Sequence, residues 1–314
     1  AFLDRNYYTS ETEAVIHYRA NPSKGLKLVA RSSEGSALGS VAPVPANGRL
    51  KVPLSESIIL QLQRDGRGIF ELKLPLRRLP PQPGAEWKID QARRLVLNNG
   101  QPFVPFGMIM AGVRDDDEAA FEQLAAHGFN TFVVWNKTTP QGMANYQRLA
   151  AKHGLSLVSY PDECAEPILW DAHTRYDSDL LKQVRRITES QNLTQLKNVL
   201  TLPISLPERE AIFGEFFHKN LDRMIAGVEA VKHAPNLAAH FIMDEPMPKE
   251  AFNQVRFGQE YFARVRQADG YHPIIVNYSS HIPEGADYTN WCDILVTDPY
   301  WHPPAGNEVR STPN

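Results

Sequence analysis

The chain has 314 residues, enough for one large α/β barrel with a small extra module or for two domains of average size. Hydrophobic residues make up 42% and charged residues 22%, a balance that is typical of a folded globular protein and excludes a disordered chain. No run approaches the roughly 18 apolar residues of a membrane span. The net charge of −3 gives no overall electrostatic signal for nucleic acid binding. The two cysteines, Cys164 and Cys292, could pair or both be free.

Residues 1–79 predict a small Ig-like antiparallel β-sandwich. They contain short segments in which apolar and polar residues alternate, separated by turns that contain Gly and Asn. The expected strands are residues 14–19, 26–31, 50–54, 58–63 and 69–74. The Pro-rich residues 79–84 break any regular element, so we expect residues 80–93 to link the sandwich to a second domain.

Residues 94–314 predict an α/β fold of the (β/α)8, TIM-like barrel type. Residues 94–103 are typical of a hairpin with a turn at Asn99 and Gly100, and residues 103–111 form an apolar run of buried-strand length. Apolar strands then alternate with amphipathic helices, which indicates a parallel sheet covered by helices. The later strands are expected at residues 129–135, 155–160, 238–243, 273–278 and 293–297, and the main helices at 115–127, 143–153, 180–189, 216–233 and 248–268.

This pattern contains only six strand–helix openings, whereas a complete barrel needs eight. Either the barrel is truncated after about six strands and incomplete at its C-terminus, or the fold is not a closed barrel. The stretch from residue 164 to residue 236 is much longer than an ordinary connection in such a fold, and we expect it to shape or cover a cleft.

Two acids follow directly after the apolar strand at residues 238–243. Asp244 and Glu245 are followed by Pro246, which ends the strand. Acids at the carboxyl end of a parallel strand lie at the mouth of a barrel, where barrel enzymes carry out their chemistry. A structural alternative remains open, in which Asp244 caps the next helix and Glu245 lies in its first turn.

Aromatic, amide and carboxylate residues follow four other expected strands. Aromatic rings cover the apolar C–H faces of a sugar, and Asn and Asp hydrogen-bond its hydroxyl groups. Together these strand ends predict a carbohydrate-binding rim, although any single aromatic residue could instead pack against its neighbours. The candidate substrate-binding residues are Trp135, Asn136, Tyr160, Asp162, Asn277, Tyr278, Asp298, Tyr300 and Trp301.

Residues 94–302 resemble glycoside hydrolases of clan A that carry an N-terminal β-sandwich. The resemblance lies in four segments: NGQPFVPFGM at 99–108, HGFNTF at 127–132, PNLAAHFIMDEP at 235–246 and CDILVTDPY at 292–300. It implies a retaining glycosidase in which Glu245 is the general acid/base. Clan members usually have Asn where this chain has Asp244. Their nucleophile is a Glu at the end of a seventh strand, which we expect beyond the end of this chain.

The chemistry assigned to Glu245 follows from the weakness of the leaving group. A glycosidic oxygen leaves poorly, so an acid must protonate it as the bond breaks. Such an acid needs a raised pKa, which apolar walls or a neighbouring carboxylate such as Asp244 would provide.

A metal site is a weaker interpretation of the same strand. Regular alternation predicts that His240 and Asp244 share a face and could be two ligands, but a single His on a buried strand is more often a hydrogen-bonded core residue. We expect no metal and no cofactor.

The leading hypothesis is a glycoside hydrolase with a polysaccharide or glycan substrate, located outside the cell or in the periplasm, with no nucleic acid partner. The alternative hypothesis is a non-catalytic carbohydrate-binding barrel. A third hypothesis is a β-sandwich protein whose barrel serves as an assembly scaffold.

Overall fold

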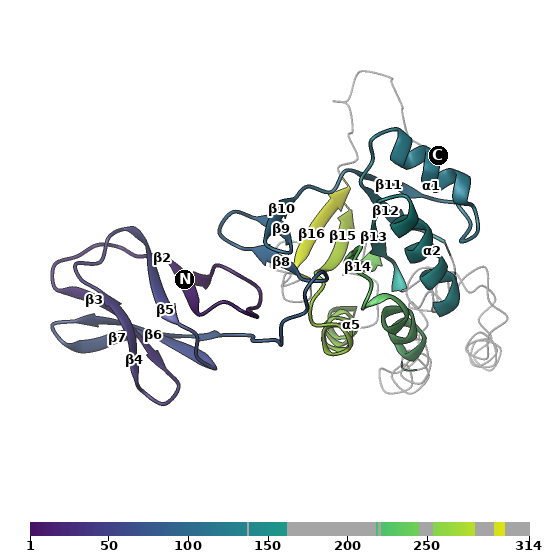
Figure 1. Ribbon diagram of the computed structural model, residues 1–314. Coiled ribbons are helices and arrows are strands. Elements are labelled where there is room, and N and C mark those ends of the chain that lie inside the picture. The colour runs from purple at the N-terminus through teal and green to yellow at the C-terminus, as the bar shows by residue number, and fades with distance from the viewer. Residues whose placement is uncertain (137, 162–217, 219–220, 245–253, 280–291, 299–314) are drawn as a thin grey trace, which may run out of the picture.

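The computed structural model describes residues 1–136, 138–161, 218, 221–244, 254–279 and 292–298 (Figure 1). It confirms the predicted fold class, because a small antiparallel β-sandwich precedes six parallel strands of a TIM-like barrel. Within the described residues, no helix is both long and apolar enough to cross a membrane.

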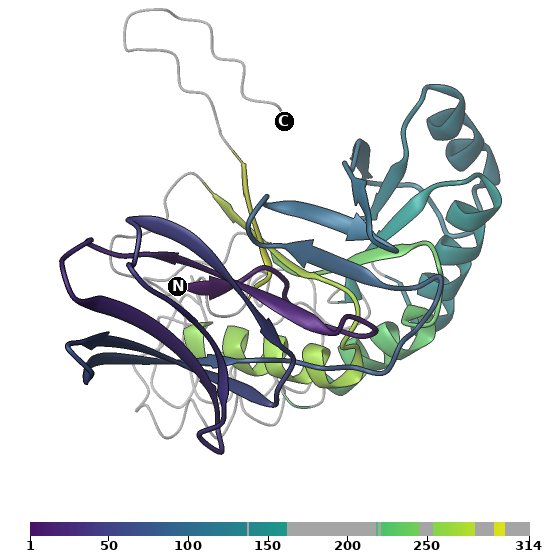
Figure 2. The same cartoon turned by 60° about the vertical axis from the view of Figure 1, so that its left-hand side comes forward.

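The sandwich consists of two antiparallel sheets with strand orders β1-β2-β5 and β4-β3-β6-β7 (Figure 2). In β2, Ala14 and Ile16 are buried in the core between the sheets, whereas His17 and Arg19 lie on the outer face. The strands are β1 (Phe2–Leu3), β2 (Glu13–Arg19), β3 (Leu26–Ser32), β4 (Ala37–Val41), β5 (Asn47–Pro53), β6 (Ser57–Arg64) and β7 (Arg67–Pro75). The alternation predicts five of these seven strands.

A three-stranded antiparallel sheet, β8 (Trp87–Asp90), β9 (Leu95–Asn98) and β10 (Gln101–Phe103), leads into the barrel. The predicted hairpin between β9 and β10 is confirmed. Its turn residues Asn99 and Gly100 have φ values of +48° and +80°, the left-handed geometry that a two-residue hairpin turn requires. β8 falls within the segment predicted as a linker, so that segment contains a regular strand; the domain boundaries at 79 and 93 stay a prediction.

The parallel sheet has its six strands in chain order, each paired with the next. They are β11 (Gly107–Met110), β12 (Thr131–Val134), β13 (Ser156–Ser159), β14 (Leu237–Asp244), β15 (Ile274–Ser279) and β16 (Ile294–Asp298). The carboxyl ends of all six therefore lie at the same edge of the sheet, which is where the predicted site residues occur.

β11 is less buried than its sequence predicts. Met108 and Ile109 point to opposite sides of the strand, and they are 43% and 51% exposed. Among the described strands, β11 pairs only with β12, so it forms an edge of the sheet and its apolar run is not enclosed.

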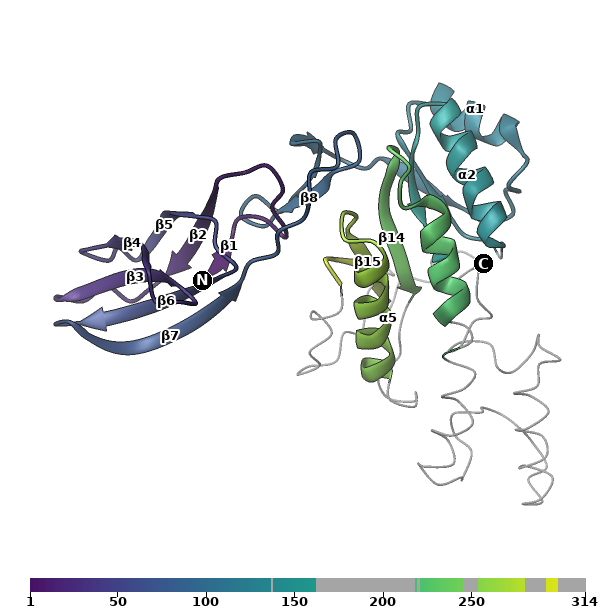
Figure 3. The same ribbon diagram turned by 60° about the horizontal axis from the view of Figure 1, so that its bottom comes forward.

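Helices cover one face of the parallel sheet (Figure 3). They are α1 (Glu118–Ala126), α2 (Pro140–Lys152), a helical segment at residues 221–231, and α5 (Gln254–Ala268). The expected signals are present at their ends: the Asp117 side chain accepts a hydrogen bond from the backbone N–H of Ala120, and Gly128 and Gly154 follow α1 and α2 with positive φ. The helix predicted at 180–189 lies outside the described residues.

Candidate active site

Three aromatic rings stack on the inner face of the parallel sheet, the side away from the helices. Strand register places Trp135, Tyr160 and Phe241 on this face, whereas Phe132 points to the opposite side and contacts Phe121 of α1. The ring of Tyr160 lies with its centroid 4.8 Å from that of Phe241 and 5.1 Å from that of Trp135. Tyr160 is buried and Trp135 is half-buried. The two predicted rim aromatics therefore pack against each other and against a core ring, and Trp135 is the more accessible of the two.

A β-bulge determines where the side chain of Asp244 points. Phe241 aligns with Ile275 of β15, but Met243 aligns with Val276, so Ile242 is an extra residue in β14. Aligned residues of neighbouring strands share a face, which places Phe241 and Asp244 together on the inner face and His240 on the helix-covered face. The prediction that His240 and Asp244 share a face is therefore wrong, because the bulge reverses the alternation between them.

Asp244 and Asn277 are joined at the carboxyl end of the sheet. The amide Nδ2 of Asn277 donates a hydrogen bond to Oδ1 of Asp244 over 2.8 Å. Asn277 is only 4% exposed, and its ladder partner is Asp244 itself. The sheet thus holds the Asp244 carboxylate on the same side as the stacked rings, as a site that recognises sugar hydroxyl groups requires.

The Asn136 side chain makes its hydrogen bonds to the loop between β11 and α1. Its Oδ1 accepts from the backbone N–H of Gly112 over 2.8 Å, and its Nδ2 donates to the carbonyl of Val113. This amide closes the loop after β11. Its predicted contact with substrate stays a prediction.

The remaining predicted site residues cannot be placed in full. Glu245, Asp162, Tyr300 and Trp301 lie outside the described residues, as does most of the long stretch predicted to cover the cleft. For Tyr278 and Asp298, the structure gives the strand position and not the side chain. Their roles stay predictions.

No family model matches the chain, and no curated protein matches it. Among solved structures, the chain is similar to a glycosyl hydrolase family 2 member from Bacteroides cellulosilyticus (14% identity, TM-score 0.43), covering 95% of this chain and 37% of that one. It is also similar to a Lactobacillus rhamnosus beta-glucuronidase (12% identity, TM-score 0.45), with 95% of this chain and 46% of that one covered. A Dictyoglomus thermophilum beta-D-glucuronidase is similar as well (13% identity, TM-score 0.43), with 94% of this chain and 46% of that one covered. The chain spans less than half of the length of these structures.

A second polar cluster lies on the helix-covered face of β14 and is completely buried. Nδ1 of His240 lies 2.7 Å from the Ser159 hydroxyl oxygen, and its Nε2 lies 2.8 Å from Oδ2 of Asp269. Nδ1 of His272 lies 2.6 Å from the same Asp269 oxygen. The three ligand atoms of His240, Asp269 and His272 lie within 4.8 Å of one another, but their close N···O distances are those of direct hydrogen bonds. His240 is thus a hydrogen-bonded core residue.

The carboxylate at the centre of this cluster fixes the proton positions. An ionised carboxylate only accepts hydrogen bonds, so Nε2 of His240 and Nδ1 of His272 donate to Asp269; in the neutral tautomer of His240 that has its proton on Nε2, Nδ1 accepts a hydrogen bond from the Ser159 hydroxyl. Burial acts to raise the pKa of Asp269, but the hydrogen bonds from His240 and His272 outweigh it and hold this pKa far below its usual range. Burial lowers the pKa of His272, which keeps that ring neutral.

Sequence reasoning misses two features of this region. Phe241 is the third ring of the aromatic stack, but an apolar residue inside an apolar strand carries no sequence signal beyond that of the core. The cluster on the other face joins three residues that are distant in the chain: strand register aligns Ser159 with His240, and Asp269, which follows α5, meets His240 through a side-chain hydrogen bond.

Proposed function

We propose that this chain is part of a glycoside hydrolase that cleaves a glycosidic bond in a polysaccharide or glycan outside the cytoplasm. One observation supports this most directly: the bulge in β14 turns Asp244 to the inner face, the face that carries the Trp135–Tyr160–Phe241 stack, and Asn277 donates a hydrogen bond to it. A carboxylate next to an aromatic surface at the mouth of a parallel sheet matches what a sugar-processing site needs.

In this proposal Glu245, the residue after Asp244, is the general acid/base. It protonates the glycosidic oxygen as the bond breaks and later takes a proton from the attacking water. Asp244 accepts a hydrogen bond from a sugar hydroxyl, and its negative charge favours the protonated form of Glu245. Trp135 offers a ring to the apolar face of the sugar.

A retaining mechanism also requires a nucleophile. Its carboxylate stands about 5–5.5 Å from that of the acid/base, and the aglycone leaves as the glycosyl–enzyme bond forms. Among the described residues, we assign no carboxylate to this role. The retaining outcome rests on the clan A resemblance and belongs to the proposal.

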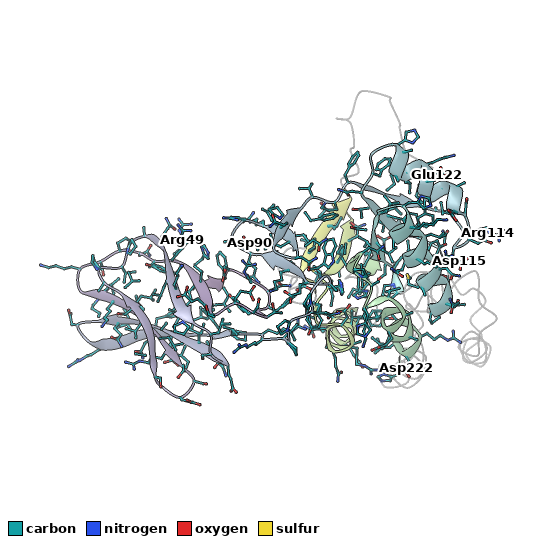
Figure 4. The ribbon with its side chains drawn as sticks, in the orientation of Figure 1. Arg49, Asp90, Arg114, Asp115, Glu122 and Asp222 are labelled. Atoms are coloured by element: carbon teal, nitrogen blue, oxygen red, sulfur yellow. The ribbon has the colours of Figure 1, made fainter. Side chains whose placement is uncertain are left out.

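The test compares Glu245→Gln with Glu122→Gln in the full-length protein, using the release of reducing sugar from a polysaccharide panel. Glu122 is an exposed residue of α1 (Figure 4) and serves as the matched control. We expect Glu245→Gln to lower turnover by about 10²- to 10⁴-fold, the usual contribution of a general acid. Glu122→Gln leaves turnover unchanged.

A second substrate series tests the proton transfer itself. An aryl glycoside with an acidic phenol as leaving group needs little protonation, so Glu245→Gln retains more bond cleavage on it than on a polysaccharide. Equal loss on both substrates, or unchanged turnover, removes Glu245 from the role of acid. Glycan binding without turnover in the parent protein would instead establish the non-catalytic alternative.

A further inference from the structure

Charge is distributed unevenly along this chain. Residues 1–79 contain twelve Lys and Arg against seven Asp and Glu, a net charge of +5, whereas the remaining residues carry −8. The overall value of −3 therefore hides a basic sandwich, and such an asymmetry indicates an anionic partner for the basic part.

A large groove lies on this basic sandwich. It is a groove of about 870 Å³ between the outer face of the β1-β2-β5 sheet and the turn that joins β8 to β9. We call it the basic groove. Its lining includes the ring residues Phe2 and His17 and four arginines, Arg5, Arg19, Arg49 and Arg93, which outnumber the two acids Asp4 and Asp90. Figure 4 shows Arg49 and Asp90, which come from the two walls.

Two of these arginines are available to a ligand. Arg19 and Arg49 are exposed, and in the part of the chain that the structure describes neither has a carboxylate within 4 Å. Arg5 and Arg93 contact carboxylates only loosely, with their Nε atoms 3.6 Å and 3.8 Å from Asp4 and Asp90. The groove thus presents guanidinium groups whose planar donor pairs match carboxylate and sulfate oxygens.

A ring platform lies beside these cations. Phe2 stacks on His17 with 5.3 Å between ring centroids and an interplanar angle of 10°, and Phe2 is 42% exposed. Strand register aligns Phe2 with His17 and His17 with Arg49, so the ring pair and a guanidinium form one row across three strands. An apolar ring next to a cation matches a sugar that has a C–H face and an acidic substituent.

We propose that the basic groove binds an anionic carbohydrate, a short glycan segment that carries carboxylate or sulfate groups. The residues that line this site all come from positions 1–93, and the proposal does not depend on Glu245 being catalytic. It would hold an acidic glycan independently of any cleavage at the parallel sheet.

The groove fits a short glycan better than a nucleic acid. Nonspecific binding of single strands uses several stacking rings along an extended basic track, whereas this groove offers one ring pair in a confined cavity. The negative charge of the rest of the chain also opposes a long polyanion that extends beyond the sandwich.

The experiment measures binding of fluorescent oligogalacturonate to the full chain by anisotropy, with sulfated dextran, neutral dextran and a single-stranded oligonucleotide as competitors. We expect the double variant Arg19→Gln/Arg49→Gln to weaken oligogalacturonate binding by at least about tenfold, and Phe2→Ala to weaken it by a smaller factor. Sulfated dextran is also tested directly in labelled form, and its affinity relative to that of oligogalacturonate identifies the preferred acidic group; binding of neither labelled polymer overturns the proposal.

The matched control is Arg64→Gln/Arg67→Gln, which removes the same charge from two exposed positions on the other sheet. It should leave the affinity unchanged within about twofold, since it alters net charge but not the groove. Equal losses in both double variants, competition by neutral dextran, or tighter binding of the oligonucleotide would each overturn the proposal. Because no readout involves turnover, a failure here is separate from a failure of the glycosidase proposal.

Discussion

The two faces of β14 carry polar groups in opposite circumstances. On the helix-covered face, His240 is completely buried and both of its ring nitrogens are hydrogen-bonded, to Ser159 and Asp269. On the inner face, Asp244 is only half-buried and lies at the end of the strand, where it contacts Asn277. One extra residue, Ile242, separates these two environments.

This difference separates a polar residue with a structural role from one that the proposed function places in the site. A buried polar group whose partners are all supplied by the protein has little capacity left for a ligand, and its removal is expected to change stability. A carboxylate at the strand end can meet substrate, and its removal is expected to change turnover. Variants on the two faces should therefore change different measured quantities.

The largest expected effect comes from Asp269→Ala. The substitution leaves two buried imidazole N–H groups, on His240 and His272, without an acceptor, so we expect the free energy of unfolding to fall by about 3–5 kcal/mol. Urea unfolding followed by circular dichroism measures it. The matched control is Asp222→Ala, since Asp222 is an exposed aspartate that pairs with Arg264 over 3.2 Å. Asp222→Ala should lower the free energy of unfolding by less than about 1 kcal/mol. Equal decreases in the two variants would show that the buried hydrogen bonds of Asp269 contribute no more to stability than an exposed ion pair.

Asp244→Asn is expected to act on turnover instead. It removes the charge that favours a protonated Glu245, and we expect about a tenfold loss of turnover, equivalent to about 1.4 kcal/mol of activation free energy. Asp115→Asn is the control, because Asp115 also accepts a hydrogen bond from an Asn amide, that of Asn145 at 2.9 Å. Steady-state kinetics and urea unfolding are measured on both variants. A stability loss without a turnover loss in Asp244→Asn would make Asp244 a structural residue.

Acidification should destabilise the protein through the buried cluster. Because burial holds the folded pKa of His272 below its usual value of 6.5, the unfolded chain takes up a proton first, and stability falls as pH falls below about 6.5. The folded pKa of Asp269 lies below its usual value of 3.8, so its contribution to stability is present above about pH 3.8 and is lost as pH falls further. Unfolding midpoints between pH 7 and about pH 2 measure both parts of this dependence.

His272→Asn separates the two titrations. The Asn amide can still donate to Asp269 but does not titrate, so the slope between pH 6.5 and pH 4 should flatten while the loss below pH 4 remains. An unchanged slope in this variant would assign the acid sensitivity to other groups.

Much of the fold could be predicted because the spacing of apolar residues and the positions of turn residues such as Gly are local properties of the sequence. Alternation marks β2 and β7, and glycines mark the ends of α1 and α2. β1 and β4 escape prediction since the first has two residues and the second is rich in small and polar ones. The exposure of β11 could not be predicted either, because an apolar run does not indicate whether a strand pairs with one neighbouring strand or with two.

For the candidate site, the sequence predicts which residues lie at the strand ends but not the face to which each side chain points. Strand ends predict Trp135, Tyr160, Asp244 and Asn277 at one edge of the sheet, and the structure shows two contacting pairs there, Trp135 with Tyr160 and Asp244 with Asn277. Which face each side chain takes depends on exact register, and the extra residue in β14 has no sequence signal inside a run of apolar residues. For this reason, regular alternation predicts that His240 and Asp244 share a face, whereas they lie on opposite faces of the sheet.

The smallest expected effect tests whether the cluster is cooperative. Ser159→Ala removes the hydroxyl that donates to Nδ1 of His240 and leaves that buried nitrogen unpaired, at a cost of about 1 kcal/mol. If the hydrogen bonds strengthen one another, Ser159→Ala should cost less in the Asp269→Ala background, because His240 has already lost its acceptor there. Urea unfolding of the two single variants and the double variant measures this coupling. Simple additivity would mean that Ser159 and Asp269 hold His240 independently, and that β14 is fixed by two separate bonds on this face.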